Sequence, residues 1–473
     1  MAFFNAHINR WPVLKAFLWM IVLGCGIVFG AQEDAPASET GVARLQAELP
    51  ERKLPVLEEM LRKGLVNGPD IIMKEWLAAV AREEVTVGRA PMLPNVSAWA
   101  RPGVIYEQHR ESGSKDRTVT SILFNVGFYQ PLYHWGALEK NYQIAQIRKA
   151  IADRNVAETR RVLAVDLRRR YFDFVLVAND LRLARLKLER VQKDREYVRQ
   201  SIDDGSLAPA EIDGANREVD LQLPEVARLE NEYAALRATL VQITGMTATQ
   251  IDRLPVEIPP LADIGEALAA MSGSVSAPPS ARAEEMADAA RIEKLNYEIA
   301  KKRLYPKIGV ELSVNQDDRR DAGDTFGQKS LVTSWNALLA VNWSLFDGFA
   351  SQATRRASLN RLRAYETSRA QIEQQEDAER RAETARLMIA WQRLQNSERD
   401  LDRTRGHLDL TEQDFASGMR SQRDVDDART SFNHATHGIH AARAQFYTTL
   451  ASYLSNRGQD PVARDRGNAG AGD

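Results

Sequence analysis

Residues 415–428 read FASGMRSQRDVDDA, and an earlier stretch at residues 202–215, IDDGSLAPAEIDGA, shares their pattern. Gly418 lies 213 positions after Gly205, and each is followed by an acidic and an apolar residue at matching places. Two more pairs of stretches recur at nearly the same interval: QPLYHW at 130–135 with WSLFDG at 343–348, and LPNV at 93–96 with YPKI at 305–308. A long interval shared by separate landmarks predicts a duplicated structural unit.

Each copy of the unit is predicted to contain one very long helix that ends near its glycine. Apolar residues keep helical spacing from about residue 132 to Gly205, and the counterpart runs from about Phe346 to Ser417 without a proline. About 70 residues at about 1.5 Å each give a rod roughly 100 Å long. The composition, 27% charged and 7% aromatic, also favours extended helices. Such helices are stable only when they pack side by side.

Strands are predicted between these rods, as hairpins at about residues 96–131 and 307–345. Apolar residues alternate with polar ones at 308–315 and at 121–128, which is the period of a strand with two unlike faces. Residues 317–329, which begin with the charge run DDRRD, are predicted to form a solvated loop. Apolar-out strands of about ten residues are typical of a membrane barrel, and the alternative is a half-buried sheet of a soluble protein.

Two hairpins give four strands, whereas about eight strands are the practical minimum for a closed barrel. In lipid, an open sheet edge leaves backbone groups without hydrogen bonds, at a cost of several kcal/mol each. The edges must therefore be paired by strands of other chains. Three copies would give twelve strands, an even count, and the long helices would form a ring beneath them. The predicted fold class is mainly α with a transmembrane β part, completed by several copies of the chain.

The N-terminus is predicted to be an export signal. Arg10 and Lys15 precede an apolar run that is too short for a stable membrane helix. Cleavage after Gly30 is one reading, and the other is a lipobox at residues 22–25 in which Cys25 becomes acylated. Because Cys25 is the only cysteine, no disulfide can form within the chain.

The remaining features exclude several function classes. A net charge of −2, with acids and bases interspersed, gives no reason to expect nucleic acid as a partner. The sequence contains no phosphate loop, zinc spacing or nucleophile constellation, so no enzyme, cofactor or metal site is predicted. The histidines at 434, 437 and 440 share one helix, but the outer two point in different directions and cannot bind one ion within that helix.

Proline-rich segments and changes in composition predict the domain boundaries. We expect a signal peptide at 1–30, a mature N-terminal segment at 31–54, the first repeat at 55–245, a connector at 246–278, the second repeat at 279–455 and a disordered tail at 456–473.

The ordered, duplicated set of motifs resembles the TolC-type outer-membrane efflux proteins. The stretches that carry the resemblance are residues 130–136, 345–348, 205–215, 418–428 and 240–245. The resemblance implies a homotrimer that shares one 12-stranded β-barrel in outer-membrane lipid, with an α-barrel that extends into the periplasm. It also implies two partners, a periplasmic adaptor and an inner-membrane pump.

The resemblance further implies that Gly205 and Gly418 mark the periplasmic tip, where the tube closes and the adaptor docks. The family has an Arg two residues after the second glycine and acids six and nine residues after it, which Arg420, Asp424 and Asp427 match. The first-repeat acid that bonds the Arg matches Glu211. One position departs from the family, because Phe415 stands where a tyrosine hydroxyl could form a hydrogen bond at the tip. The alternative for the two aspartates is a solvated start of a helix.

The sequence therefore predicts an outer-membrane exit duct that passes cargo without altering it chemically. The alternative is a periplasmic adaptor or structural protein built on coiled-coil hairpins. An adaptor would have one helical hairpin between β-rich modules, whereas this chain has two hairpins with strand pairs at their other ends. Efflux of small molecules and secretion of protein remain equally compatible with the sequence.

Overall fold

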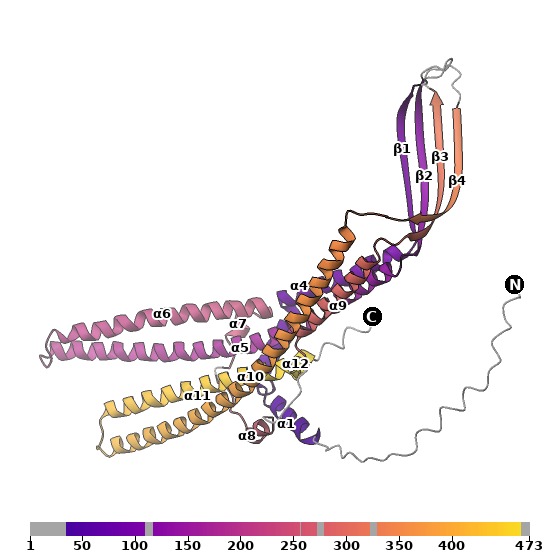
Figure 1. The fold of residues 1–473 in the computed structure, drawn as a ribbon. Coiled ribbons are helices and arrows are strands. Elements are labelled where there is room, and N and C mark those ends of the chain that lie inside the picture. Colours follow the sequence, from indigo (N-terminus) through magenta and orange to yellow (C-terminus); the bar gives the residue numbers. More distant parts are fainter. Residues whose placement is uncertain (1–34, 109–116, 256, 272–278, 322–328, 465–473) are drawn as a thin grey trace, which may run out of the picture.

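The computed structural model describes most of the chain, and Figure 1 draws its fold. The described residues are 35–108, 117–255, 257–271, 279–321 and 329–464. The predicted signal peptide at 1–30 and Cys25 lie outside the described residues, as does the end of the tail from residue 465.

Two pairs of long antiparallel helices dominate the molecule (Figure 1). The first hairpin is formed by α5 (Ala137–Asp203) and α6 (Glu211–Thr244), and the second by α10 (Ala350–Ala416) and α11 (Gln422–Asn456). Helices α5 and α10 are both 67 residues long. The rods predicted from apolar spacing are therefore confirmed. Their tips lie at the same end of the molecule, and the sheet lies at the other end (Figure 1).

The duplication extends to the elements before each rod. In both repeats a 21-residue helix precedes two strands, and the strands lead into the long helix. The corresponding elements are α4 (Pro69–Arg89) with α9 (Ala281–Lys301), β1 (Asn95–Glu107) with β3 (Lys307–Asp321), and β2 (Arg117–Tyr133) with β4 (Lys329–Asn342).

Short helices lie around the middle of the rods. They are α1 (Ala35–Ala47), α2 (Pro50–Lys53), α3 (Pro55–Asn67), α7 (Ala248–Ile251), α8 (Gly265–Met271) and α12 (Pro461–Arg464). The 3-10 helix η1 (Ala90–Met92) instead follows α4 at the sheet end, where it contacts β2 and α5.

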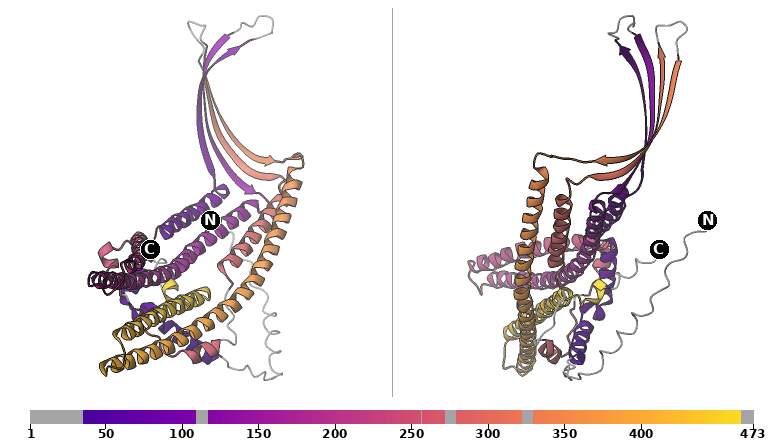
Figure 2. Two further views of the ribbon diagram at one scale, coloured as in Figure 1. Left: turned by 90° about the vertical axis from the view of Figure 1, so that its left-hand side faces the viewer. Right: turned by 45° about the vertical axis from the view of Figure 1, so that its right-hand side comes forward.

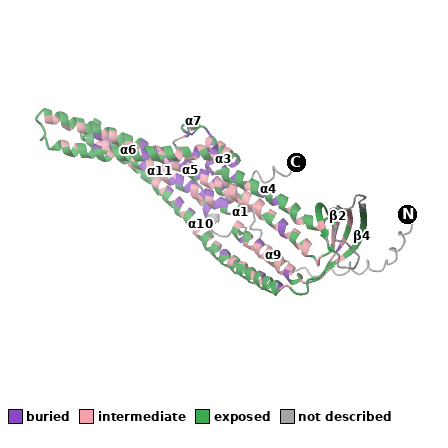
Figure 3. Cartoon of the chain, turned by 90° about the horizontal axis from the view of Figure 1, so that it is seen from above, coloured by how far each residue is buried: buried purple, intermediate pink, exposed green. Residues whose placement is uncertain are grey.

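The buried core also lies in the middle of the molecule, where the short helices meet the rods (Figure 3). Tyr171 and Phe172 of α5 are buried there, and Phe172 stacks on Tyr447 of α11 with ring centroids 5.7 Å apart. A second buried cluster joins α10 and α11 to α1 and α8 through Leu45, Leu268 and other side chains. The first and second repeats are thus held together by buried packing of α5 against α11 and of the short helices against the rods.

The four strands form one antiparallel sheet in the order β1-β2-β3-β4, so β1 and β4 are its edges. Pairing of β2 with β3 joins the hairpins of the two repeats. The sequence prediction of a loop from residue 317 is wrong in part, because β3 continues to Asp321. There Asp317 accepts a hydrogen bond of 3.1 Å from the Ser121 hydroxyl, and it pairs with Arg319 at 2.7 Å. Charged side chains can thus continue a strand when the neighbouring strand offers polar partners.

The register places the predicted apolar residues of neighbouring strands on one face. Val314 lies opposite both Val126 and Trp335, and Leu312 lies opposite Phe128. In the single chain this face is open, and the side chain of Trp335 is 79% exposed. No helix among the described residues is long and apolar enough to cross a membrane.

A left-handed turn joins each sheet hairpin to its rod. Trp135 and Gly136 have φ of 56° and 75°, and the corresponding Gly348 and Phe349 have φ of 63° and 64°. Positive φ is unfavourable for a bulky residue such as Trp135. Its indole N–H donates a 2.7 Å hydrogen bond to the carbonyl of Pro306, and this contact with the second repeat holds the strained residue in place.

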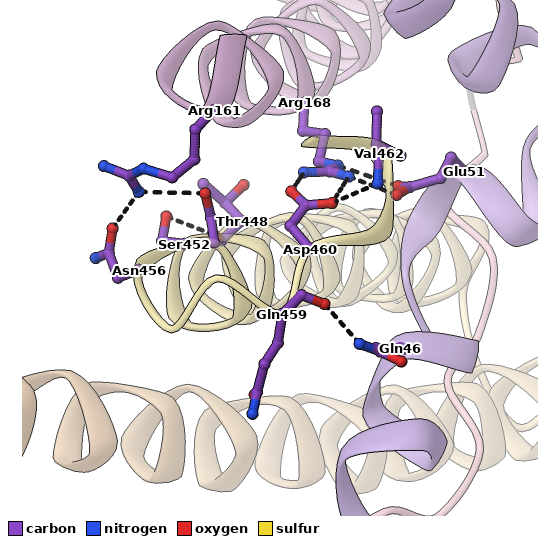
Figure 4. Close-up of polar contacts among 11 residues, drawn as sticks. Gln46, Glu51, Arg161, Arg168, Thr448, Ser452, Asn456, Gln459, Asp460 and Val462 are labelled. Carbon is purple, nitrogen blue, oxygen red and sulfur yellow. Dashed lines mark hydrogen bonds and ion pairs between the residues drawn. The ribbon is translucent and has the colours of Figure 1, made fainter. Parts of the chain in front are cut away.

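The predicted disorder from residue 456 is wrong for the described part of that segment. Asp460 is buried and receives two hydrogen bonds from Arg168, at 2.5 and 3.0 Å (Figure 4). Arg168 also donates two hydrogen bonds to Glu51, at 2.5 and 3.1 Å. Composition suggested a solvated tail, but one buried charge pair fixes the segment against the middle of α5.

Candidate functional site at the hairpin tips

The first tip is a tight turn that requires glycine. Helix α5 ends at Asp203, and Gly205 follows with φ of 74°. The N–H of Gly205 donates to the carbonyl of Ile202 at 3.0 Å, and that of Ser206 donates to Ser201 at 2.8 Å. These two bonds form a Schellman motif, which satisfies the last carbonyls of the helix. Glycine adopts the left-handed conformation at low cost, whereas other residues do so less readily.

The second tip repeats this geometry. Gly418 has φ of 78° and donates to the carbonyl of Phe415 at 2.9 Å, while Met419 donates to Asp414 at 2.9 Å. Phe415 and Met419 are exposed in the single chain. The two glycines identified in the sequence therefore occupy equivalent turns, and each turn presents apolar side chains to its surroundings.

Asp424 caps the helix that leaves the second tip. Its carboxylate accepts hydrogen bonds from the Ser421 backbone N–H at 2.9 Å and from the Ser421 hydroxyl at 2.8 Å. In return the Asp424 N–H donates to the Ser421 hydroxyl at 3.3 Å, which completes a capping box. The pKa of the Asp424 carboxyl is lowered, first by these Ser421 hydrogen bonds and then by the charges of Arg420 and Arg423.

Glu211 occupies the place in the first repeat that Asp424 occupies in the second. It is the first residue of α6, and its side chain is exposed. Ala208 stands at the position equivalent to Ser421, so a reciprocal cap cannot form. The two tips therefore share a backbone turn but differ in the groups available for contact.

The structure does not bring Arg420 and Glu211 together as an ion pair within the described chain. The Arg420 guanidinium instead lies 3.8 Å from the carboxylate of Asp414, at the end of α10. Both side chains are about half exposed, so this pair contributes roughly 0–1 kcal/mol. If Arg420 reaches an acid of another hairpin, it must do so between copies of the chain.

Asp427 has a partner that the sequence prediction missed. Arg190 of α5 lies across from it, with 3.6 Å between Nη2 and the Asp427 carboxylate. Arg190 Nη1 also donates a 3.2 Å hydrogen bond to the Thr430 hydroxyl. An ion pair between residues so far apart in sequence leaves no local pattern. The tip acid Asp427 is thus tied to the first hairpin of the same chain.

A second polar contact crosses between the hairpins nearer the core. His437 Nδ1 lies 3.2 Å from the carboxylate of Asp180. Burial raises the pKa of Asp180, and the charge of His437 opposes this change. Of the three histidines of α11, His440 accepts a 3.5 Å hydrogen bond from the N–H of Ile258. Within the described residues, no group of three or more His, Cys, Asp or Glu side chains is arranged to hold a metal ion.

Comparison with known proteins places these features in a family. The family model described as outer membrane efflux protein matches residues 60–246 and 281–453, which are most of the chain and include both tips. The chain belongs to this family. Family membership confirms the resemblance deduced from the motifs and locates the protein in the outer membrane, with a long periplasmic part. Members of the family are channels and not enzymes.

Two curated relatives are similar over part of their length. Outer membrane protein TolC of Vibrio cholerae is 22% identical over 198 residues, which are 41% of this chain and 43% of TolC. The pyoverdine export outer membrane protein OpmQ of Pseudomonas aeruginosa is 22% identical over 284 residues, which are 58% of each protein. The matched regions thus span about half of these relatives.

Solved structures confirm the fold class over a larger share of the chain. The CmeC outer membrane channel of Campylobacter jejuni superimposes with a TM-score of 0.70 at 10% identity. The superposition covers 86% of this chain and 86% of CmeC. The outer-membrane efflux protein described here therefore has the long-helix and strand architecture of those channels.

Proposed function

We propose that this protein is the outer-membrane exit duct of a tripartite export system. Three copies form one tube, and small molecules or secreted protein pass through its lumen unchanged. A periplasmic adaptor and an inner-membrane pump deliver the cargo to the tube. The adaptor binds the outside of the helical hairpins near their tips.

The open four-stranded sheet is the observation that carries this proposal. Its apolar face is exposed in the single chain, with Trp335, Leu339 and Val341 among the exposed side chains. Strands β1 and β4 are its edges. In lipid, such a sheet is incomplete until both edges are paired. A copy of β4 beside β1 of the next chain pairs both edges, and three copies close a barrel of twelve strands.

The helical hairpins support the same stoichiometry. Each chain supplies two hairpins of nearly equal length, so a trimer has six hairpins in a ring with approximate sixfold symmetry. The tips with Gly205 and Gly418 then meet at one end of this ring. Exposed apolar residues at these turns, including Leu207 and Met419, are available to an adaptor or to neighbouring tips.

The tips form the proposed periplasmic gate. Arg420, whose guanidinium lies 3.8 Å from Asp414 within the chain, reaches Glu211 of a neighbouring copy when the tips converge. Asp424 and Asp427 lie three positions apart on α11 and form two acidic rings in a trimer. Rings of acids favour the passage of cations and bind divalent ions. Exposed ion pairs are weak, so adaptor contacts suffice to open such a gate.

The direct test is the state of the full-length protein in membranes. Outer membranes of cells that express it are extracted in mild detergent and run on a gel with and without boiling. The proposal expects a band at the mass of a trimer that collapses to a monomer on boiling. A Trp335→Asp variant, which places a charge on the lipid face, should lose the membrane-inserted trimer.

A protein recovered as a soluble periplasmic monomer would overturn the proposal and favour the adaptor-like alternative. Crosslinking in cells then tests the partners, since a duct should be recovered with both an adaptor and a pump.

A further inference from the structure

The two hairpins of one chain run alongside each other (Figure 2), and they meet along α5 and α11. The side chains that make this contact change in character towards the tips. In the middle of the molecule, buried aromatic packing joins the two helices, as Phe172 and Tyr447 show. Nearer the tips, the buried cluster of Leu181, Val226 and Leu229 draws its members from α5 and α6 alone. Polar contacts cross between the hairpins there.

Arg190 makes a two-point contact across this part of the interface. Its guanidinium lies 3.6 Å from the Asp427 carboxylate and donates a 3.2 Å hydrogen bond to the Thr430 hydroxyl. The Thr430 hydroxyl gives its own proton to the carbonyl of Asp426, at 2.7 Å. Its oxygen therefore faces Arg190 as an acceptor. Asp427 and Thr430 lie one helical turn apart, so one planar guanidinium reaches both.

A trimer of this duplicated chain has two kinds of contact between hairpins. The own-chain seam joins α5 and α11 of one copy, as in this structure. The between-copy seam joins α10 of one copy to α6 of the next, and the duplication makes its geometry approximately equivalent.

Each residue of the Arg190 contact has a counterpart in the between-copy seam, which is found by applying the interval between the two repeats. At the repeat interval of 213 residues, Arg403 corresponds to Arg190, Gly214 to Asp427, and Arg217 to Thr430.

The two seams are therefore chemically different. The own-chain seam pairs an arginine with an acid and a hydroxyl. The between-copy seam has a second arginine, Arg217, where the hydroxyl would be, and Gly214 supplies no acid. Arg403 lies 3.3 Å from Asp400 of its own helix, so part of its charge is balanced inside α10. Like charges across an interface repel each other, and this seam lacks the attraction that holds the first.

We propose that Arg190, Asp427 and Thr430 form a latch that keeps the two hairpins of each chain together, so that the tip opens by parting between copies. This inference rests on the trimeric duct proposed above. Arg190 acts as a positioning residue: it touches no cargo, but it holds the acid Asp427 and the helix that carries it.

The first test is removal of the latch. Single-channel conductance of the purified full-length protein is compared in planar bilayers for the wild type and Arg190→Ser. Without the latch, the own-chain seam can part as well as the between-copy seam, and loss of an exposed pair shifts the ratio of parted to closed own-chain seams by up to about fivefold for each copy. The time spent in high-conductance states should therefore rise. Arg403→Ser, the matched control on the between-copy seam, should not raise it. The charge swap Arg190→Asp with Asp427→Arg should return the conductance towards the wild type.

The second test moves the latch to the other seam. Gly214 lies within α6, and a Cβ added there meets no atom within 4 Å, so Gly214→Asp fits without strain. Together with Arg217→Thr, it gives the between-copy seam the acid and hydroxyl that Arg403 lacks. In the Arg190→Ser background, these two substitutions should lower the conductance again by joining neighbouring copies.

The results separate this inference from the proposed function. If the wild type forms no trimer and no channel in bilayers, the duct itself is wrong. If channels form but Arg190→Ser conducts as the wild type does, or Arg403→Ser raises conductance equally, the latch is wrong and the duct stands. A heat-modifiable trimer on an unboiled gel shows that each variant has folded.

Discussion

Arg168 and Asp460 form a fully buried ion pair that ties the segment after α11 to the middle of α5, with hydrogen bonds of 2.5 and 3.0 Å. Glu51 of α2 binds the same guanidinium from the other side (Figure 4). Burial alone would lower the pKa of Arg168, but hydrogen bonds and charges of Asp460 and Glu51 raise it above its ordinary value. One arginine thus joins three segments that are distant in sequence.

We expect Asp460→Asn to destabilise the fold by roughly 2–3 kcal/mol, because it weakens two charged hydrogen bonds in a buried site. Glu51 still balances the charge of Arg168. The expected destabilisation is therefore smaller than the roughly 3–5 kcal/mol that is typical when a buried ion pair loses one partner. Thermal unfolding of the detergent-solubilised protein, followed by circular dichroism, measures the change. Asp402→Asn, on the exposed face of α10, is the control and should leave the melting temperature within about one degree. Equal melting curves for both variants would contradict the structural role of the pair.

The tip acids should control block of the channel by divalent cations. Asp424→Asn with Asp427→Asn should weaken the block of single-channel current by Mg²⁺ or Co²⁺, because both proposed acidic rings lose their charge. Arg190→Ser should strengthen the block, since it releases Asp427 from its cationic partner. Unchanged block in the double variant would remove these acids from the gate. Ser421→Ala serves as the control for the helix cap, because it removes the hydroxyl that binds Asp424 while keeping the carboxylate.

Replacing a turn glycine with alanine should destabilise the protein, whereas replacing a glycine inside a long helix should stabilise it. Gly418→Ala should destabilise the second tip by about 1 kcal/mol, because alanine is strained at φ of 78°. Gly406→Ala should stabilise α10 by roughly 0.5–1 kcal/mol, since Gly406 is helical and its added Cβ meets no atom within 4 Å. The measurement is the hydrogen-exchange rate of the backbone amides at the tip, which should rise in Gly418→Ala and should not rise in Gly406→Ala. Faster exchange at the tip in Gly406→Ala would contradict this account.

Most of the fold could be predicted because its signals are local and repeated. Helical spacing sustained along a rod and alternation within a strand each follow from neighbouring residues, and the duplication doubles every signal. The glycines of the tips were found for the same reason. Arg190 and Asp460 were missed because their roles depend on partners that are remote in sequence, and neither composition nor spacing encodes such a pair. The charged end of β3 was missed because its polar partner, Ser121, belongs to the other repeat.

A comparison of the two repeats reveals the unequal seams only when the contacts between helices are known. Once Arg190 is known to bind Asp427, the interval of 213 residues shows that Gly214 cannot do the same for Arg403. The sequence alone does not say which helices meet, so the comparison has no meaning until α5 and α11 are seen side by side. The unequal pairs therefore became informative only with the structure.

The stability of the helical part should fall as the pH is lowered through the range in which histidine titrates, and His440 should account for part of this change. Burial lowers the pKa of His440, and the charge of Arg443 lowers it further. In the folded protein the neutral ring also accepts a hydrogen bond from Ile258, at Nδ1. The unfolded chain takes up a proton at about pH 6.5, whereas the folded chain resists protonation until a lower pH.

The stabilisation from neutral His440 is therefore complete above the ordinary histidine pKa and is lost as the pH falls through the lower, folded-state value. Melting temperatures of the wild type and His440→Gln, measured from about pH 8 down to about pH 5, the range in which histidine changes its charge, should converge as the pH decreases. His434→Gln, on the same helix, is the control and should run parallel to the wild type. If His440→Gln retains the full pH dependence of the wild type, the buried ring is not its source.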